Sequence, residues 1–562
     1  MRRIRSLSAS LVALVAVDLV VRFPFLAPRL VTARGICNYA GAALVLAIVL
    51  RLSLYLRAHP RMLLLSVLIA APMAAQTATF AAYGQFLEPA DLVLFAQSPS
   101  VVLSAAGAGT VGAVPWLVFV AALAAVNLLP GDVRRLPRRT TAALVAALIA
   151  LVSVGAAYWR ASPTLEHPQA AFACSVVGLL RRTVVLSSAG DHVAVAPLPR
   201  DGARPNIVLV LGESLVASHL SFYGYGRDTS PRLERLFEQK AFVAFNDATV
   251  MGPSTRTSVP YILTGLEGPD VHGRVFRAPT VLEYARARGY HTAFISAQDE
   301  GWGNFDVLFR EGADTFRSGI AFASSVDVMR GADDIDVLEQ GVLPAVRTLA
   351  EPFFVVLHMN GGHAPYAEHS RAASKAFLPE DGANSINAYD NTVRETDEYL
   401  ARLFEALRAR DPGAWLFYTS DHGQALGDGN AFFNHGYQEN VVRDPLLTFP
   451  PASERGRLEA LASAQVAACD LAPTILHVMG AAPAAPMDCV DWLASSPSLQ
   501  SRVRVVSAYT PAFVSEPTML LVLEDGRREL FDLGRGTVDF AESEPRKVSD
   551  VPIPPQIAAR LR

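Results

Sequence analysis

Residues 207–214 read Ile-Val-Leu-Val-Leu-Gly-Glu-Ser, an uninterrupted apolar run that ends in polar residues. A short run without polar alternation is typical of a strand that is buried on both faces of a parallel sheet. Three later segments repeat the pattern: Thr292–Ser296, Phe353–Leu357 and Trp415–Tyr418. Longer amphipathic stretches separate these runs, so we predict an α/β domain with a central, mostly parallel sheet.

Polar residues that suit metal binding follow each of these predicted strands. They are Glu213, then Gln298-Asp299-Glu300, then His358 to His363, and then Ser420-Asp421-His422-Gly423. Ligands bind beyond the carboxyl ends of strands in open α/β sheets, so we expect these distant segments to meet there. One Glu, an adjacent Asp-His pair and further histidines are ligand types that zinc accepts, and the further histidines are His363 and His435.

Residues 251–265 read Met-Gly-Pro-Ser-Thr-Arg-Thr-Ser-Val-Pro-Tyr-Ile-Leu-Thr-Gly. A Gly-Pro turn followed by hydroxyl residues is typical of a helix start, where free N–H groups and the helix dipole favour an anionic oxygen. A threonine hydroxyl is a weak nucleophile at neutral pH, but a bound divalent metal would lower its pKa, as it does for water. The alternative is a cluster of hydroxyls that only caps a helix.

Five apolar stretches precede this domain, at residues 7–28, 36–56, 62–83, 113–130 and 140–159. Each is close to the roughly 20 residues that a helix needs to cross a bilayer. The arginine clusters before the first stretch and after the second and fourth mark one side as cytoplasmic. We therefore predict a five-helix transmembrane domain over residues 1–160, with the rest of the chain on the opposite side. A cleaved signal peptide at the first stretch is the alternative, but four more stretches follow it.

Residues 161–204 form a predicted connector and linker. An apolar run over residues 170–180 is followed by Arg181 and Arg182, which favours an amphipathic element on the membrane surface. The three prolines between Val193 and Asn206 indicate a linker, so the catalytic domain is expected over residues 205–562.

The net charge and the cysteine content argue against two further classes of protein. A net charge of -4 over 562 residues supplies no strong field, which argues against a nucleic-acid-binding protein. Four cysteines are too few for a disulfide scaffold. Cys469 and Cys489 are the only plausible pair, and two separate buried thiols are favoured over a bond between them.

The order of these motifs resembles the alkaline phosphatase/sulfatase superfamily, and within it the membrane-bound phosphoethanolamine transferases that modify lipopolysaccharide. The resemblance covers nearly the whole chain. The similar blocks are Gly212-Glu213-Ser214 with Tyr223–Pro231, Ser254–Pro260, Asn360–Pro365, Tyr389-Asp390-Asn391, Ser420–Gly423 and Asn434-His435-Gly436. Two departures are Leu215-Val216, where many members have an arginine, and Met251, where most have a cysteine.

The resemblance implies roles for individual residues. Glu213, Thr255, Asp421 and His422 would hold one zinc ion, with a second zinc ion left open. His363 and His435 would contact the phosphoryl group, a second zinc ion or the leaving oxygen. Residues 389–403 space their apolar side chains as a helix does, so packing rather than catalysis is expected for Tyr389-Asp390-Asn391.

The implied activity is transfer of phosphoethanolamine from phosphatidylethanolamine to lipid A or the lipopolysaccharide core, through a phosphothreonine at Thr255. It would take place on the periplasmic side of a bacterial inner membrane. A phosphoglycerol transferase, a phosphodiesterase or phosphatase, and a membrane-anchored binding protein stay open as alternatives. Sulfatases carry Cys or Ser, Pro and Arg where this chain has Thr255, Thr257 and Val259, so sulfate ester hydrolysis is not expected.

Overall fold

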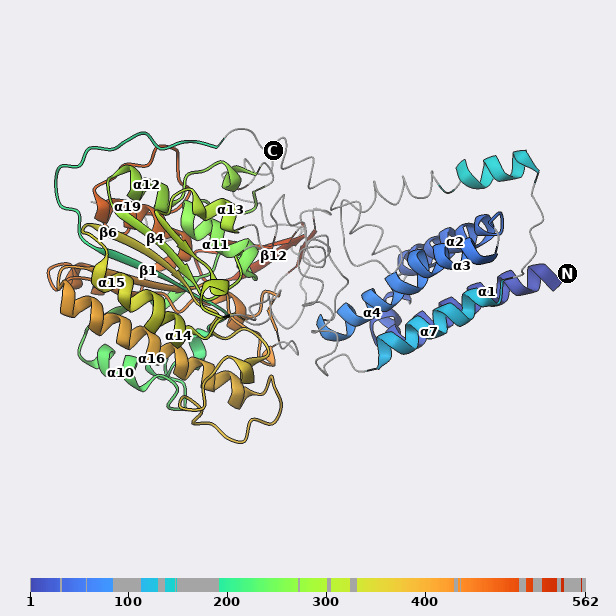
Figure 1. Cartoon of the computed structure of the whole chain (residues 1–562), viewed down its shortest axis with the longest axis horizontal. Helices are drawn as coiled ribbons and strands as arrows, with labels where there is room; N and C mark the ends of the chain where they lie inside the picture. Colours follow the sequence, from blue (N-terminus) through green and yellow to red (C-terminus); the bar gives the residue numbers. More distant parts are fainter. Residues whose placement is uncertain are drawn as a thin grey trace. The chain divides into compact units, whose positions relative to one another are not determined.

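The computed structural model describes residues 2–30, 33–56, 58–83, 113–129, 137–146, 148, 192–270, 273–300, 305–323, 331–428, 433–434, 436–494, 502–508, 518–532, 537–539 and 557. The chain forms two compact units: Met1–Val184 with Val514–Pro517, and Val185–Phe513 with Thr518–Arg562 (Figure 1). The domain boundaries expected at residues 160 and 204 stay predictions. Residues 161–191 of the expected connector lie outside the described residues.

The first unit is helical wherever the structure describes its predicted spans. Its helices are α1 (Arg2–Leu30), α2 (Ala33–Ser53), α3 (Ala58–Leu65), a π-helical turn (Ser66–Ala70), α4 (Ala71–Tyr83) and α7 (Val114–Asn127). The hydroxyl of Ser10 in α1 donates to Ala125 O in α7 at 2.7 Å, and the hydroxyl of Tyr39 in α2 donates to Asp18 Oδ2 in α1 at 2.9 Å. The fifth predicted span, residues 140–159, is described only as far as residues 146 and 148.

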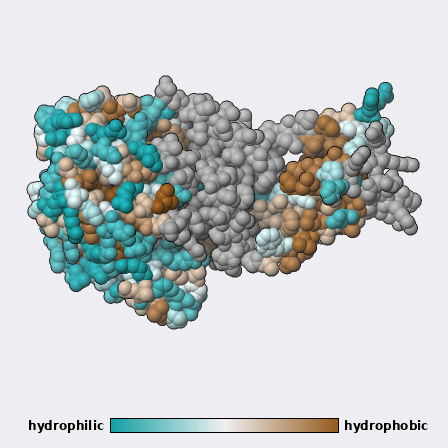
Figure 2. Space-filling view, in the orientation of Figure 1, coloured by the Kyte–Doolittle hydropathy of each residue, from teal (hydrophilic) through white to brown (hydrophobic). Residues whose placement is uncertain are grey.

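Apolar side chains cover much of the described surface of this helical unit (Figure 2). Among the described residues, the helix His59–Thr77 is long and apolar enough to cross a bilayer by itself, and three shorter apolar helices accompany it in this unit. Large apolar side chains such as Val20 (80% exposed), Leu63 (69%) and Trp116 (65%) face outward. Exposed apolar surface on this scale is costly in water and is typical of a surface that another apolar phase covers.

The second unit is built on a seven-stranded sheet with strand order β2-β8-β7-β1-β6-β4-β5. The strands are β1 (Ile207–Gly212), β2 (Val243–Ala244), β4 (His291–Ser296), β5 (Thr315–Arg317), β6 (Phe353–His358), β7 (Trp415–Ser420) and β8 (Leu447–Phe449). Strand β8 pairs antiparallel with β7 and β2, and all other pairs are parallel. The prediction of a mostly parallel sheet is confirmed, and the four predicted strands are β1, β4, β6 and β7.

Helices cover both faces of this sheet, which explains why the strands read as continuous apolar runs. Ile207 and Leu209 in β1 pack in one apolar cluster with residues of α11, α12 and α19, while Val208 and Val210 pack in another with residues of the α14 to α16 region (Figure 1). The helices of this unit are α10 (Pro231–Glu238), α11 (Thr255–Thr264), α12 (Val281–Ala287), α13 (Phe305–Arg310), α14 (Asp334–Val337), α15 (Leu343–Thr348), α16 (Ile386–Arg410), α17 (Glu439–Val442), α18 (Arg455–Glu459) and α19 (Leu471–Met479).

Smaller sheets complete the unit. Strands β3 (Asp247–Thr249) and β9 (Gln465–Ala467) pair in parallel, and an antiparallel sheet holds β10 (Arg504–Ser507), β11 (Thr518–Val522), β12 (Arg528–Asp532) and β13 (Thr537–Asp539). The predicted linker is docked on the domain, because Val193 N donates to Arg277 O and Leu198 N donates to Ala287 O. A disulfide joins Cys469 and Cys489, so the expectation of two separate thiols was wrong.

Candidate metal and nucleophile site

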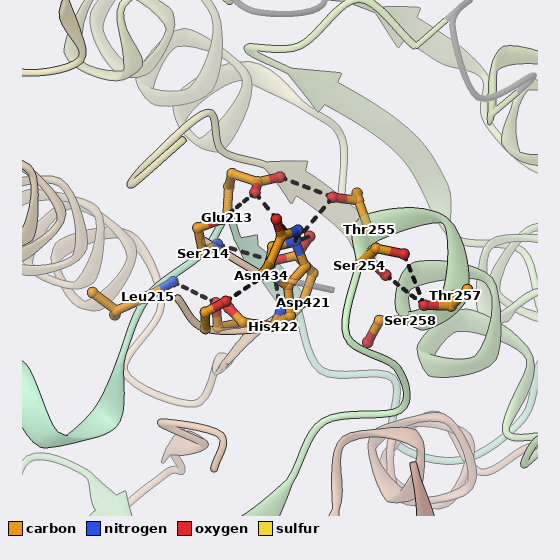
Figure 3. Close-up of polar contacts among 12 residues, drawn as sticks. Glu213, Ser214, Leu215, Ser254, Thr255, Thr257, Ser258, Asp421, His422 and Asn434 are labelled. Carbon is orange, nitrogen blue, oxygen red and sulfur yellow. Dashed lines mark hydrogen bonds and ion pairs between the residues drawn. The ribbon is translucent and has the colours of Figure 1, made fainter. Parts of the chain in front are cut away.

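Strand ends bring the predicted ligands together. Strand β1 lies between β6 and β7, and the ladder continues past the strand ends because Asp421 N donates to Gly212 O at 3.0 Å. Glu213, Asp421 and His422 each present one ligand atom, and these three atoms lie within 4.8 Å of one another. All three residues are buried, so the cluster forms at the predicted edge of the sheet (Figure 3).

Thr255 is the first residue of α11 and is buried beside this cluster. Its hydroxyl donates to Glu213 Oε2 at 3.1 Å and lies 3.4 Å from His422 Nε2 (Figure 3). The side chain of Ser254 makes no cap to α11; its hydroxyl contacts that of Thr257 at 2.9 Å. The hydroxyl cluster is therefore more than a helix cap, since it directs one side chain into the group of predicted ligands.

The two oxygens of Asp421 have different surroundings. Its Oδ1 accepts the main-chain N–H groups of Ser214 at 3.0 Å and of His422 at 2.7 Å. Its Oδ2 is buried, lies 3.3 Å from His422 Nε2, and accepts no hydrogen bond from the described residues. A buried carboxylate oxygen is costly without a donor or a cation, so Oδ2 is the atom that a metal ion would satisfy.

The ring of His422 has a fixed orientation. Its Nδ1 donates to Gly423 O at 2.9 Å, since a carbonyl oxygen can only accept. Nε2 therefore faces the carboxylates, 3.3 Å from Asp421 Oδ2 and 3.5 Å from Glu213 Oε1. A cation bound among these atoms would be attracted by both carboxylates, and a main-chain oxygen behind the ring is the usual support of a histidine that binds a metal.

The electrostatics of the two carboxylates agree with this requirement. Burial, followed by the neighbouring charge of Glu213, raises the pKa of Asp421 to about 6. Burial also acts to raise the pKa of Glu213, but the charges of His422 and His363 outweigh it and lower that pKa to about 2. One glutamate, one aspartate and one histidine nitrogen fit a zinc ion in both ligand type and spacing.

Of the two further predicted histidines, the structure describes His363 but not His435. His363 follows Gly362, whose N–H donates to Glu213 O at 3.0 Å, and its ring nitrogen Nδ1 donates to Ala364 O at 2.7 Å. This residue is half-buried and its charge reaches Glu213. His435 lies outside the described residues, so its predicted role stays a prediction.

Four further residues contact the site and were given no role from the sequence: Ser214, Gln298, Gln424 and Asn434. The Ser214 hydroxyl donates to Glu213 Oε1 at 2.6 Å and itself accepts from Gln424 Nε2 at 2.9 Å. The Asn434 amide nitrogen lies 3.2 Å from His422 Nε2. Ser214 and Gln298 each lie two residues past the end of a buried strand, β1 and β4, and this position was the available signal.

The Tyr389-Asp390-Asn391 segment packs and also forms hydrogen bonds to loops. All three side chains are buried in α16, as expected for a packed helix face. The Tyr389 hydroxyl contacts the loop after Glu213, Asp390 accepts from His219, Tyr225 and Arg227, and Asn391 bonds to the loop at Phe377. Tyr389 and Asp390 therefore hold the segment between β1 and α10, and Asn391 holds the loop at Phe377.

Comparisons with known proteins agree with this fold. Residues 205–481 match the Sulfatase family. The Kdo(2)-lipid A phosphoethanolamine 7''-transferase of Salmonella typhimurium is 24% identical over 298 residues, which cover 49% of this chain and 51% of that protein. The chain spans 38% to 51% of the length of the curated relatives it matches.

Two solved structures share the architecture. The integral membrane protein lipooligosaccharide phosphoethanolamine transferase A (EptA) from Neisseria meningitidis aligns with a TM-score of 0.62 at 16% identity, covering 85% of this chain and 95% of that chain. The C-terminal periplasmic domain of EptC from Escherichia coli, in complex with Zn, aligns with a TM-score of 0.50 at 19% identity, covering 59% of this chain and 97% of that chain. Residues 205–481 thus form a Sulfatase-family domain, and the relatives of the chain include proteins named phosphoethanolamine transferases.

Proposed function

We propose that this chain transfers a phosphoethanolamine group from phosphatidylethanolamine to an envelope glycolipid, lipid A or the lipopolysaccharide core, through a phosphothreonine at Thr255. The observation that carries the proposal is the contact of the Thr255 hydroxyl with Glu213 and His422, at 3.1 and 3.4 Å, inside a buried group of ligand types. The names of the relatives favour phosphoethanolamine over phosphoglycerol as the transferred group.

Glu213, Thr255, Asp421 and His422 would hold one zinc ion. The bare Oδ2 of Asp421 and the inward Nε2 of His422 support this assignment, as does the zinc complex of the similar EptC domain. When bound, zinc lowers the pKa of a coordinated hydroxyl and stabilises negative charge on the transferring oxygens.

The chain's own residues account for the remaining chemistry. In the first step the Thr255 oxygen forms a bond to phosphorus, and the bond from phosphorus to the diacylglycerol oxygen breaks. The amino-terminal end of α11, with its helix dipole, favours the phosphoryl oxygens. His363, and His435 by the family resemblance, would donate the proton that the leaving oxygen needs. In the second step an acceptor hydroxyl or phosphate displaces the group from Thr255.

The proposed reaction places the enzyme in a bacterial inner membrane with its catalytic domain in the periplasm. Both the donor and the acceptor are lipids, so a membrane unit would keep the catalytic domain near its substrates. The exposed apolar surface of the helical unit supports this location. The disulfide between Cys469 and Cys489 also supports it, because such bonds persist in oxidising compartments.

Intact-mass analysis of the full-length chain, incubated with phosphatidylethanolamine and zinc, tests the proposal. Wild type is expected to gain the mass of one phosphoethanolamine group, Thr255→Ser to gain the same mass, and Thr255→Ala to gain none. A phosphoglycerol adduct from phosphatidylglycerol alone would favour that rival transferase. Lipid turnover by the Thr255→Ala variant at the wild-type rate would refute the covalent mechanism.

A further inference from the structure

A glutamine beyond strand β4 contacts the predicted metal ligand Glu213 from the buried side. Gln298 is 6% exposed, and its Nε2 donates to Glu213 Oε2 at 2.9 Å and to Met359 O at 2.8 Å. We infer that Gln298 is a positioning residue, which fixes the Glu213 carboxylate for the cation. The inference rests on the proposed metal site and extends it to a residue outside the predicted ligand set.

The hydrogen bonds fix the orientation of the Gln298 amide. An amide NH₂ has two N–H groups, and both contacted oxygens can only accept, so the nitrogen must face them. His358 Nε2 lies 3.2 Å from the same nitrogen, and His358 Nδ1 lies 2.7 Å from Glu300 Oε1. Nδ1 donates to the Glu300 carboxylate, and Nε2 lies beside the amide nitrogen, whose two N–H groups are directed at Glu213 and Met359. His358 and Glu300 are fully buried, so this pair supports the glutamine from behind.

Hydrogen bonds also hold the main chain of Gln298 and of the residue before it. Gly319 N donates to Gln298 O at 2.7 Å, and Ala332 N donates to Ala297 O at 2.7 Å. A Cβ atom at residue 319 would lie only 2.3 Å from Ala297 O, so the two segments approach as closely as a glycine allows. Gln298 therefore presents its amide from a rigid loop, as precise support of a metal ligand requires.

This arrangement gives each Glu213 oxygen its own surroundings. Oε2 accepts from Gln298 at 2.9 Å and from Thr255 at 3.1 Å. Oε1 accepts from Ser214 at 2.6 Å and lies 3.5 Å from His422 Nε2. Without the Gln298 donor the carboxylate would lose one of its fixed partners, and rotation away from the cation would become easier. Loss of such an outer partner typically weakens metal binding about 10–100-fold.

The test compares zinc affinity in full-length wild type and Gln298→Met, which keeps the side-chain length but has no donor. Zinc is titrated against a fluorescent chelator, and Asp421→Ala supplies the background from other zinc-binding groups. Thr292→Val is the matched control, because it removes one part-buried hydrogen bond, from Asp314 N, near the start of strand β4, whereas Gln298 lies beyond its end. The expected result is zinc affinity lowered about 10–100-fold for Gln298→Met and unchanged for Thr292→Val.

Two further measurements separate positioning from general damage. In the presence of chelator, the midpoint temperature of thermal unfolding should be lowered similarly in Gln298→Met and Thr292→Val. Adduct formation in Gln298→Met should recover at saturating zinc, because Thr255 is intact. If Gln298→Met does not fold, Gln298→Leu takes its place, because it also lacks the donor and should show the same weaker zinc binding. Equal zinc affinity in wild type and either Gln298 variant overturns the inference. If wild type itself binds no more zinc than Asp421→Ala, the proposed metal site fails instead.

Discussion

The hydroxyl of Tyr389 donates to the main-chain oxygen of Ser214 at 2.7 Å, although 175 residues separate them. The same hydroxyl accepts the N–H of Val216 at 2.8 Å. Ser214 has a φ of 58°, in the left-handed region that residues other than glycine rarely adopt. A buried phenol in α16 thus holds the turn that follows Glu213 in a conformation it would not readily keep alone.

Tyr389→Phe should therefore destabilise the catalytic domain and loosen the metal site together. The change leaves the buried N–H of Val216 without its acceptor, which costs about 1–3 kcal/mol in unfolding free energy. We expect a lower thermal midpoint and weaker zinc binding, measured by thermal unfolding and by chelator competition. The ring contacts with Tyr366 and His219 are retained, because phenylalanine keeps the aromatic ring.

Tyr418→Phe is the matched control for this prediction. Tyr418 is equally buried, and its hydroxyl forms no hydrogen bond within the described part of the chain. Removing an unsatisfied buried hydroxyl should leave stability unchanged or raise it, and zinc binding should not change. Equal losses of stability in the two variants would show that the Tyr389 hydrogen bonds have no special effect.

Asp421→Asn should stabilise the protein when zinc is absent and destabilise it when zinc is present. Burial and the charge of Glu213 raise the pKa of Asp421 to about 6, so the ionised carboxylate destabilises the metal-free fold at pH 8. The amide keeps an oxygen for the N–H groups of Ser214 and His422 but lacks the second carboxylate oxygen. We expect the variant to unfold at a higher temperature than wild type with chelator, and at a lower one with zinc. A variant that zinc stabilises as much as wild type would exclude Asp421 as a ligand.

The sequence predicted the parts of this site that follow from strand position. Glu213 and the Asp421-His422 pair each follow a continuous apolar run, and adjacent parallel strands must bring such residues to one edge. Gln298 also follows a buried strand, but its side-chain type gave no reason to expect a bond to Glu213, and Tyr389 on an apolar helix face was expected to pack. Their partners lie 85 and 175 residues away and depend on packing that no local pattern encodes.

The cysteine pair illustrates the same limit. Cys469 lies in the turn Ala468–Asp470 before α19, and Cys489 lies in an irregular segment after it, so their spacing alone did not distinguish a bond from two thiols. Only the fold of the intervening chain brings their Cα atoms to 5.9 Å. The helical unit differs from the disulfide in this respect. Hydropathy alone predicted helices at its first four spans, without any tertiary information.

Stability should depend on pH through Asp397, which is fully buried in α16. Burial raises its pKa from 3.8 to about 6, against the opposing N–H groups of Leu233 and Arg232. A raised pKa in the folded state means that its stabilising contribution is complete below about pH 4 and is lost as the pH rises through 6. The unfolding free energy of wild type relative to Asp397→Asn should therefore fall by about 3 kcal/mol over this range.

Denaturant unfolding of both proteins at several pH values measures this difference. Other buried carboxyl groups with raised pKa values, such as Asp334, contribute equally to both proteins and cancel. A constant difference between the two proteins from pH 4 to pH 7 would contradict the assignment to Asp397.

Breaking the Cys469–Cys489 disulfide should destabilise the catalytic domain. The bond closes a loop with a sequence separation of 20 residues. Such a loop is worth about 3 kcal/mol in the chain-entropy account. We expect Cys469→Ala with Cys489→Ala to lower the thermal midpoint, and reductant to lower that of wild type but not that of the double variant. Peptide mapping without reductant should recover residues 469 and 489 in one linked fragment; two free thiols there would refute the bond.

Gly361→Ala tests how closely the loop after β6 must approach Glu213. A Cβ atom at residue 361 would lie 2.7 Å from Glu213 O, and neither main-chain segment can move easily because Gly362 N donates to that oxygen at 3.0 Å. Gly382→Ala is the matched control, since both glycines have positive φ, 32° and 116°, but a Cβ at residue 382 meets nothing within 4 Å. Positive φ penalises alanine in both variants, and the close contact with Glu213 O is added in Gly361→Ala alone. We expect Gly361→Ala alone to weaken zinc binding and to reduce the Thr255 adduct, measured by chelator competition and intact mass. Equal adduct yields in the two variants would mean that the loop tolerates displacement and that Glu213 does not depend on it.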